Sequence, residues 1–216
     1  MLMTTMYRSC NEQARTRRAG CRLVRYSQNM YSYESDGMRT ALYQALVRGN
    51  VEQLAAAVEA GADVNDFVGP GEERPLTVAI EFFQCPAERH AALHVLLAAG
   101  ANPTLLDDDE EFLGPLFSAM LARDAAAIEI LLVAGADPGL EHRGVGETLY
   151  EATEFDYLIE TWMMKLPEEP AEADQISEAA WLAFLTRIAA KHGKPAPDCM
   201  SVLWRAGARR SPGKSA

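Results

Sequence analysis

The chain has 216 residues, 49% of them hydrophobic, and a formal net charge of −11. Its apolar runs are shorter than the ~18–20 residues that cross a bilayer, so we expect no membrane partner. The acidic charge argues against a nucleic-acid partner, because phosphates would be repelled, and fits a basic protein partner.

Residues 1–35 differ in charge from the rest of the chain. They contain six Arg and two Glu, a formal charge of +4, so the remainder carries −15. An Arg-rich, acid-poor start is typical of a mitochondrial transit peptide, but a disordered tail, or a true start at Met30 or Met38, explains it more simply. We predict a basic, disordered tail over 1–35.

The four cysteines form no C-x-x-C pair; they are Cys10, Cys21, Cys85 and Cys199. This spacing suits free thiols in a reducing compartment, so we expect a cytoplasmic protein. Arg outnumbers Lys by 16 to 4 and Ala is abundant, which indicates a GC-rich, bacterial genome.

One short motif then recurs four times: EAGADVN (59–65), AAGANPT (98–104), VAGADPG (133–139) and RAGARRS (205–211). The separations between its glycines are 39, 35 and 72 residues, the last being twice 36. Apolar residues stand 7, 4 and 3 positions before each Gly, as in Leu54, Ala57 and Val58, which is the spacing of one helix face. The Gly is therefore predicted to end a helix, because it can adopt a positive φ without steric cost.

A second helix is predicted upstream of each of the first three copies and again at 149. The same spacing recurs at Leu42/Ala45/Leu46, Leu76/Ala79/Ile80, Leu116/Ala119/Met120 and Leu149/Ala152/Thr153. Pro75 and Pro115 stand directly before the first Leu, where Pro suits the first turn of a helix. Each unit is thus predicted as helix, tight turn, helix, Gly stop and loop. Such units bury their apolar faces only by stacking on one another.

These units resemble ankyrin repeats. TALYQALVRGNVEQLAAAVEAGADVN (40–65) and GPLFSAMLARDAAAIEILLVAGADPG (114–139) match the family pattern T-P-L-H-x-A-A-x-x-G-H-x-x-x-V-x-x-L-L-x-x-G-A-D-V-N without a gap. Residues 74–103 match with about five extra residues near Gln84–Glu88, between the two helices of this unit. Residues 147–165 resemble a first helix and a following helix, without the Gly-Ala-Asp ending, and the last unit is recognised by CMSVLWRAGAR (199–209).

The resemblance implies an all-α fold, an ankyrin-repeat solenoid of about five repeats with the last two irregular. Its domain would span 36–210, followed by a tail at 211–216, and its units would be 36–66, 67–105, 106–140, 141–170 and 176–210. In the family, the His of T-P-L-H ties neighbouring loops together through hydrogen bonds. Here it is replaced by Tyr43, Thr77, Phe117 and Tyr150, so we expect less regular loops.

The C-terminal third is expected to close the stack. The acidic segment LPEEPAEADQ (166–175) is predicted to be mobile, and Ser177 to cap a helix that runs to about Lys191. Bulky apolar residues on that helix would seal the end of the stack; they are Trp181, Leu182, Phe184, Leu185 and Ile188. The three Trp, at 162, 181 and 204, are predicted to pack in the core or in this cap.

Two features are candidate sites of chemistry. His90 and His94 have the spacing of metal ligands, but HAALH lacks a catalytic Glu, so two exposed histidines without a role are expected, with a metal-dependent enzyme as an alternative. The acidic run 107–111 lacks the alternating ligands and turning Gly of a calcium loop, and we interpret it as an acidic finger rather than a merely solvated loop. Nucleophile, P-loop and dinucleotide motifs do not occur, so we expect no catalysis, cofactor or metal.

The resemblance implies binding of a protein on a concave face made from loop tips and first helices. Aromatic anchors within a charged rim suit such an interface, and acids speed the encounter with a basic partner. We expect a protein that is monomeric when free and neutralises a specific partner, such as an immunity protein for a bacterial toxin; a scaffold or host-directed effector is the alternative. Carried over by register, the partner-facing positions are Arg39, Val47, Arg48, Glu73, Glu81, Phe82, Glu110, Glu111, Leu113, Arg143, Glu154 and Phe155, with both Phe expected to be exposed.

Overall fold

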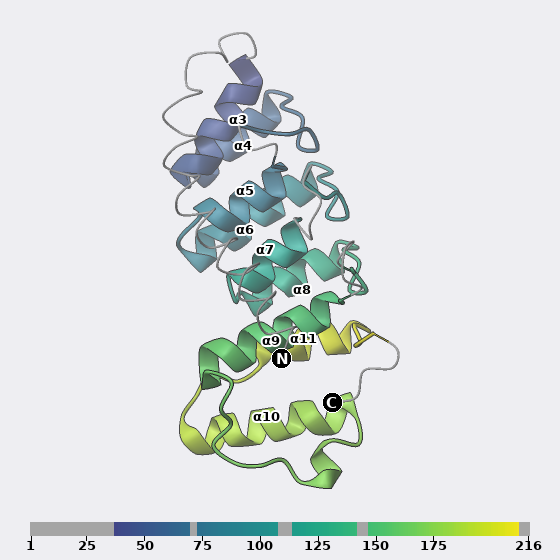
Figure 1. The fold of residues 1–216 in the computed structure, drawn as a ribbon. Helices are drawn as coiled ribbons and strands as arrows, with labels where there is room; N and C mark the ends of the chain where they lie inside the picture. Colours follow the sequence, from purple (N-terminus) through teal and green to yellow (C-terminus); the bar gives the residue numbers. More distant parts are fainter. Residues whose placement is uncertain (1–36, 70–72, 108–113, 142–146, 212–216) are drawn as a thin grey trace.

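The computed structural model describes residues 37–69, 73–107, 114–141 and 147–211 (Figure 1). Within these ranges the regular structure is nine α-helices and one 3-10 turn, with two isolated β-bridges and no strand. The prediction of an all-α protein is therefore confirmed for the described residues. None of the helices there is long and apolar enough to cross a membrane. The predicted N-terminal tail and residues 212–216 lie outside the described residues.

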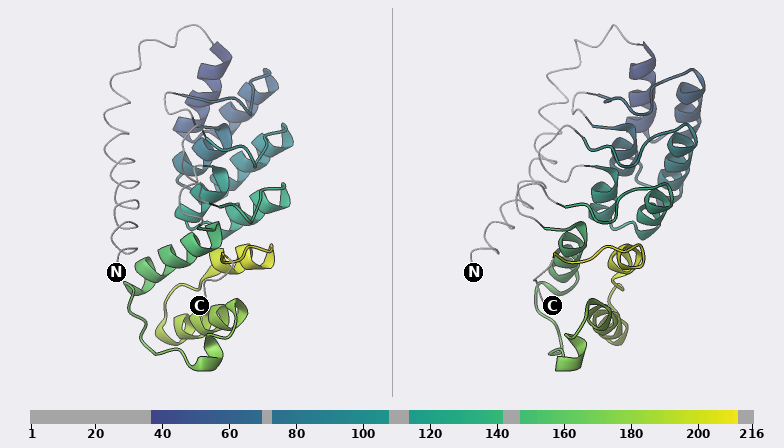
Figure 2. Two further views of the ribbon diagram at one scale, coloured as in Figure 1. Left: turned by 45° about the vertical axis from the view of Figure 1, so that its right-hand side comes forward. Right: turned by 90° about the vertical axis from the view of Figure 1, so that its right-hand side faces the viewer.

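The helices form two parallel rows, seen edge-on in Figure 2. In the first row α3 contacts α5, α5 contacts α7, and α7 contacts α9; in the second row α4 contacts α6, α6 contacts α8, and α8 contacts α11. The bounds are α3 Gly37–Arg48, α4 Val51–Glu59, α5 Pro75–Phe82, α6 Pro86–Ala98, α7 Pro115–Leu121, α8 Ala125–Val133, α9 Leu149–Trp162, η2 Glu172–Asp174, α10 Glu178–His192 and α11 Asp198–Arg205.

Local chemistry explains where these helices begin. Pro75, Pro86 and Pro115 occupy the first turns of α5, α6 and α7, where the missing N–H costs nothing. In α4 and α8, a side-chain oxygen of Asn50 or Asp124 accepts a hydrogen bond from a first-turn amide, at 2.8 and 3.0 Å. Each of these starts is therefore fixed by a residue in the first turn or directly before it.

The predicted Gly stops are confirmed at all four copies of the motif. Gly61, Gly100, Gly135 and Gly207 have φ between 91° and 101°. The amide of each following Ala donates to the carbonyl five residues earlier, over 2.9–3.1 Å, and the Gly amide donates to the carbonyl three residues earlier. Together these bonds satisfy the last carbonyls of α4, α6, α8 and α11 in the same way.

The predicted apolar stripes form one continuous core. Leu54, Leu93, Ile128 and Met200, seven positions before each Gly, are fully buried. The first-row residues Leu42, Leu76, Leu116 and Leu149 are at most 3% exposed, and the Ala three positions after each is equally buried. Because Ala is small, it allows the closely spaced first-row helices to pack.

The extra residues near Gln84–Glu88 extend a helix rather than a loop. Helix α6 has 13 residues, whereas α4 and α8 have nine, and the four additional residues lie at its N-terminus. Pro86 starts this extra turn, and the following residues, Ala87 to His90, contain no helix breaker.

Residues 147–165 contain one helix, not the predicted pair. Helix α9 runs for 14 residues, since the sequence up to Trp162 contains neither Gly nor Pro. The second-row partner of α9 is α11. In the sequence, η2 and α10 therefore separate the two members of this pair. The segment 166–175, expected to be mobile, includes η2, and Glu168 within it lies 2.7 Å from Lys191 Nζ.

Helix α10 covers the end of the two rows, at the bottom of Figure 1. The predicted cap is confirmed, because its five bulky apolar residues are at most 9% exposed. Ser177 caps the helix as predicted, accepting a hydrogen bond from the Ala180 amide at 3.1 Å. Trp162 and Trp181 are buried, and Trp204 packs against the core from a partly buried position.

Candidate functional site

The side chains of five of the predicted partner-facing residues are not described by the structure. Glu110, Glu111, Leu113 and Arg143 lie outside the described residues. Arg39 belongs to α3, but its side chain lies outside the described part of the chain.

The remaining candidates lie along the first row and its loops. Arg48, the last residue of α3, is exposed, and Val47 beside it is half-buried. Glu73 is half-buried in the loop before α5, where its backbone bridges to Val68. Glu81, near the end of α5, accepts a hydrogen bond from Ser118 Oγ at 3.4 Å.

The two predicted aromatic anchors are less exposed than expected. Phe82 and Phe155 are half-buried, and Phe82 packs against the core. Their helices, α5 and α9, belong to a row in which each member contacts the next.

Glu154 does not face a partner, which corrects the prediction. It is 9% exposed, and its carboxylate accepts hydrogen bonds from Trp181 Nε1 at 2.5 Å and from Arg210 Nε at 3.0 Å. Arg210 NH2 also donates to it, at 2.5 Å. The carboxylate is therefore covered by α10 and the C-terminal segment, which the sequence assigned to a separate unit.

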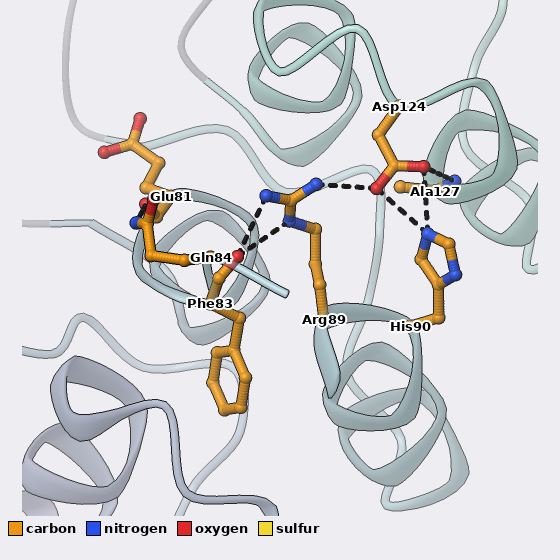
Figure 3. Close-up of polar contacts among 7 residues, drawn as sticks. All are labelled: Glu81, Phe83, Gln84, Arg89, His90, Asp124 and Ala127. Atoms are coloured by element: carbon orange, nitrogen blue, oxygen red, sulfur yellow. Dashed lines mark hydrogen bonds and ion pairs between the residues drawn. The ribbon is translucent and has the colours of Figure 1, made fainter. Parts of the chain in front are cut away.

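A polar cluster, which we call the α6–α8 cluster, joins Arg89 and His90 to Asp124 (Figure 3). Arg89 NH1 donates to Asp124 Oδ2 at 2.7 Å, and His90 Nε2 lies 2.9 Å from both carboxylate oxygens. Arg89 also donates from Nε and NH2 to the Phe83 carbonyl, at the end of α5. The extra turn of α6 thus connects α5, α6 and the start of α8.

The charges of this cluster are largely buried. The side chains of Asp124, Arg89 and His90 are 8%, 11% and 25% exposed. Burial by itself would raise the pKa of Asp124, but hydrogen bonds from the Ala127 amide, Arg89 and His90 hold that pKa below its usual value. Asp124 is thereby kept as a carboxylate between two donors.

The expectation of two exposed histidines without a role is wrong for His90. It is half-buried against Asp124, whereas His94 is exposed. The sequence missed this contact because it placed the extra residues of the second unit between helices. Over the described ranges, no group of three or more His, Cys, Asp and Glu side chains is placed to hold a metal ion.

A second ion-pair group links α7 to α9. Arg123 has a left-handed φ of 55°, in the same region as Gly49 after α3 at 65°. Its guanidinium lies 3.0 Å from Asp156 and 3.1 Å from Glu160. Partial burial would lower the pKa of Arg123, but these two carboxylates raise it. Like Arg210–Glu154 and Arg89–Asp124, this group joins two elements through a cation and a carboxylate.

Asn and Arg side chains make hydrogen bonds between neighbouring loops. Asn65 Nδ2 donates to the Gly100 carbonyl at 3.0 Å, and the Asn102 amide donates to Asn65 Oδ1 at 2.7 Å. Arg74 donates to the carbonyls of Leu106, at 3.1 Å, and of Asn65. Asn65 and Arg74 therefore tie the segment between α4 and α5 to the loop after α6.

Asp107, the first residue of the predicted acidic finger, points inward. It is 7% exposed and accepts a hydrogen bond from the Arg74 amide at 2.6 Å. Burial raises the pKa of this carboxyl to about 6. Its role is to hold the base of the loop, and the other four acids of the run, residues 108–111, lie outside the described residues.

In comparisons with known proteins, no protein-family model and no curated protein matches the chain. The described acids and bases reported above pair mainly with one another and with backbone groups. The features left facing solvent on the first row are a mixture of charged and apolar side chains.

Proposed function

We propose that the chain is an ankyrin-type repeat protein that binds a specific protein partner. The observation that carries this proposal is the Gly stop, which recurs four times with the same two backbone hydrogen bonds and φ within 10°. It recurs at the sequence positions on which the resemblance to ankyrin repeats depends.

Within this proposal the repeats number four, not five. They are the helix pairs α3–α4, α5–α6, α7–α8 and α9–α11, and η2 with α10 is an insertion inside the last pair. The insertion accounts for the double spacing of 72 residues between Gly135 and Gly207. It also supplies the apolar cap that a terminal repeat needs.

The proposed binding face is the first row together with its loops. Among its described residues, Arg48 is exposed, while Val47, Glu73, Glu81, Phe82 and Phe155 are half-buried and Glu154 is omitted. A basic partner fits the acidic balance of the chain, because opposite charge speeds encounter and disfavours wrong partners. We propose neutralisation of a basic protein, with an immunity protein as one form and a scaffold or host-directed effector as the alternative.

Charge reversal on two faces tests the location of binding. The partner is first identified by pull-down from the native cell and mass spectrometry, then purified. Glu73→Lys with Glu81→Lys changes the first row, and Glu59→Lys with Glu129→Lys makes the same change in net charge at exposed positions of the second row.

We expect the first pair of substitutions to weaken binding by about tenfold or more and the second by less than about threefold, measured by calorimetry. Circular dichroism checks that both variants fold. Equal losses from the two variants would mean that overall charge, and not this face, governs binding, and the proposed location would be rejected.

A further inference from the structure

Two methionines at the end of α9 are exposed in a way that the fold does not require. Met163 is 83% exposed and Met164 51% exposed. The other methionines whose side chains are described, Met120 and Met200, are 3% and 0% exposed. The chain thus places two thioethers in solvent and shields two others completely.

The backbone at this turn holds the exposed pair in place. Met163 and Met164 have φ of 51° and 60°, in the left-handed region that side chains other than Gly rarely adopt. Their amides donate to the carbonyls of Ile159, at 2.8 Å, and Leu158, at 3.0 Å. The backbone therefore closes the turn by itself, and a Gly, as at position 193 after α10, would fit it with less strain.

The surroundings of the turn are packed. Trp162, directly before it, is 7% exposed and meets the His192 ring edge-on, with centroids 6.2 Å apart. Glu168, shortly after it, lies 3.0 Å from His192 Nε2. Because Met163 and Met164 are exposed although their surroundings are packed, reagents can reach the two sulfur atoms without any opening of the core.

We propose that the Met163–Met164 turn is a site of reversible oxidation by peroxides. The thioether sulfur attacks one peroxide oxygen, so that an S–O bond forms while the O–O bond breaks. The sulfur loses two electrons, and the second oxygen of hydrogen peroxide leaves as water. Thiol-dependent sulfoxide reductases reverse the change.

The position of the two side chains determines what oxidation does. A sulfoxide is polar, so at Met120 or Met200 it would place an unsatisfied polar group in the core. At Met163 and Met164 the new oxygen is solvated, and the helices are left intact. This inference does not depend on the proposed partner.

Peptide-resolved mass spectrometry of the full chain in hydrogen peroxide tests the proposal. We expect Met163 and Met164 to gain oxygen at least about tenfold faster than Met120 and Met200, with Met163 ahead of Met164, since rates follow access. Far-UV circular dichroism should not change when the two have reacted. Similar rates at all four, or helix loss in step with oxidation of the turn, would overturn the proposal.

The same chain unfolded in urea is the control. There the four rates should converge, because the difference is caused by burial; a persistent difference would contradict the structural explanation. Methionine sulfoxide reductases acting on both sulfoxide epimers, with dithiothreitol, should then return Met163 and Met164 to the thioether. Failure of this reduction would reject reversibility.

Discussion

Asp124 and Asn50 occupy the same place before a second-row helix, but they act differently. Both cap the helix with a side-chain oxygen. Asp124 also pairs with Arg89 and His90 of the extra α6 turn, and its side chain is only 8% exposed. A buried carboxylate is stable only with such donors, so its charge, and not its capping, distinguishes it from Asn50.

Asp124→Asn separates these two roles, because Asn can still cap. We expect the free energy of unfolding at pH 7 to fall by about 1–3 kcal/mol, since Arg89 loses its buried anion. Asn50→Asp, at a more exposed cap, should change it by less than about 0.5 kcal/mol. Urea unfolding measures both.

The difference between wild type and Asp124→Asn should also depend on pH. The pKa of Asp124 is lowered in the folded state, so its stabilisation is complete above the unfolded-state pKa, about 3.9. It is lost as the pH falls through the lower, folded value. The difference between the two proteins should therefore begin to shrink below about pH 4, and a constant difference down to pH 3 would contradict a role for the charge.

At the scale of elements, local signals were sufficient for most helices. The i, i+3, i+4 stripes and the Gly stops predicted α3 to α8 because these features involve residues within one turn or two of each other. The pairing of α9 with α11 could not be predicted in this way, since an inserted helix separates them. For the same reason Glu154 was assigned to the surface, although α10 covers it.

Arg210 is the residue that should hold the inserted helix in place. Its guanidinium donates hydrogen bonds to the Glu154 carboxylate, and its backbone amide donates one to Glu178 Oε1 at 2.8 Å. We expect Arg210→Ala to lower the free energy of unfolding by about 3–5 kcal/mol, because Glu154 is left with a buried, uncompensated charge.

Arg209→Ala is the matched control for that substitution. The Arg209 side chain is 52% exposed and its Nε lies 3.7 Å from Glu178, so the cost should stay below about 1 kcal/mol. Unfolding followed by the fluorescence of the three Trp, of which Trp181 lies on α10, measures both variants. Equal effects at the two positions would show that Arg210 does not anchor the insertion.

At the scale of the whole molecule, two rows of helices share one core, and each row presents a separate face (Figure 2). Composition and repeat spacing predicted the class of fold, and the acidic balance suggested the charge of a partner. The candidate site was less accessible to prediction, because the burial of Glu154 depends on contacts with Trp181 and Arg210, which are distant in the sequence. The repeat register alone predicts where a residue lies on a helix, but it does not predict whether its side chain is exposed to solvent.

Hydrogen–deuterium exchange, compared between the free chain and its complex with the purified partner, tests the central claim most directly. The account predicts that binding slows exchange in α3, α5, α7 and the loops before them, and leaves α4 and α8 nearly unchanged. Slowed exchange concentrated in α4, α6 and α8 would contradict it.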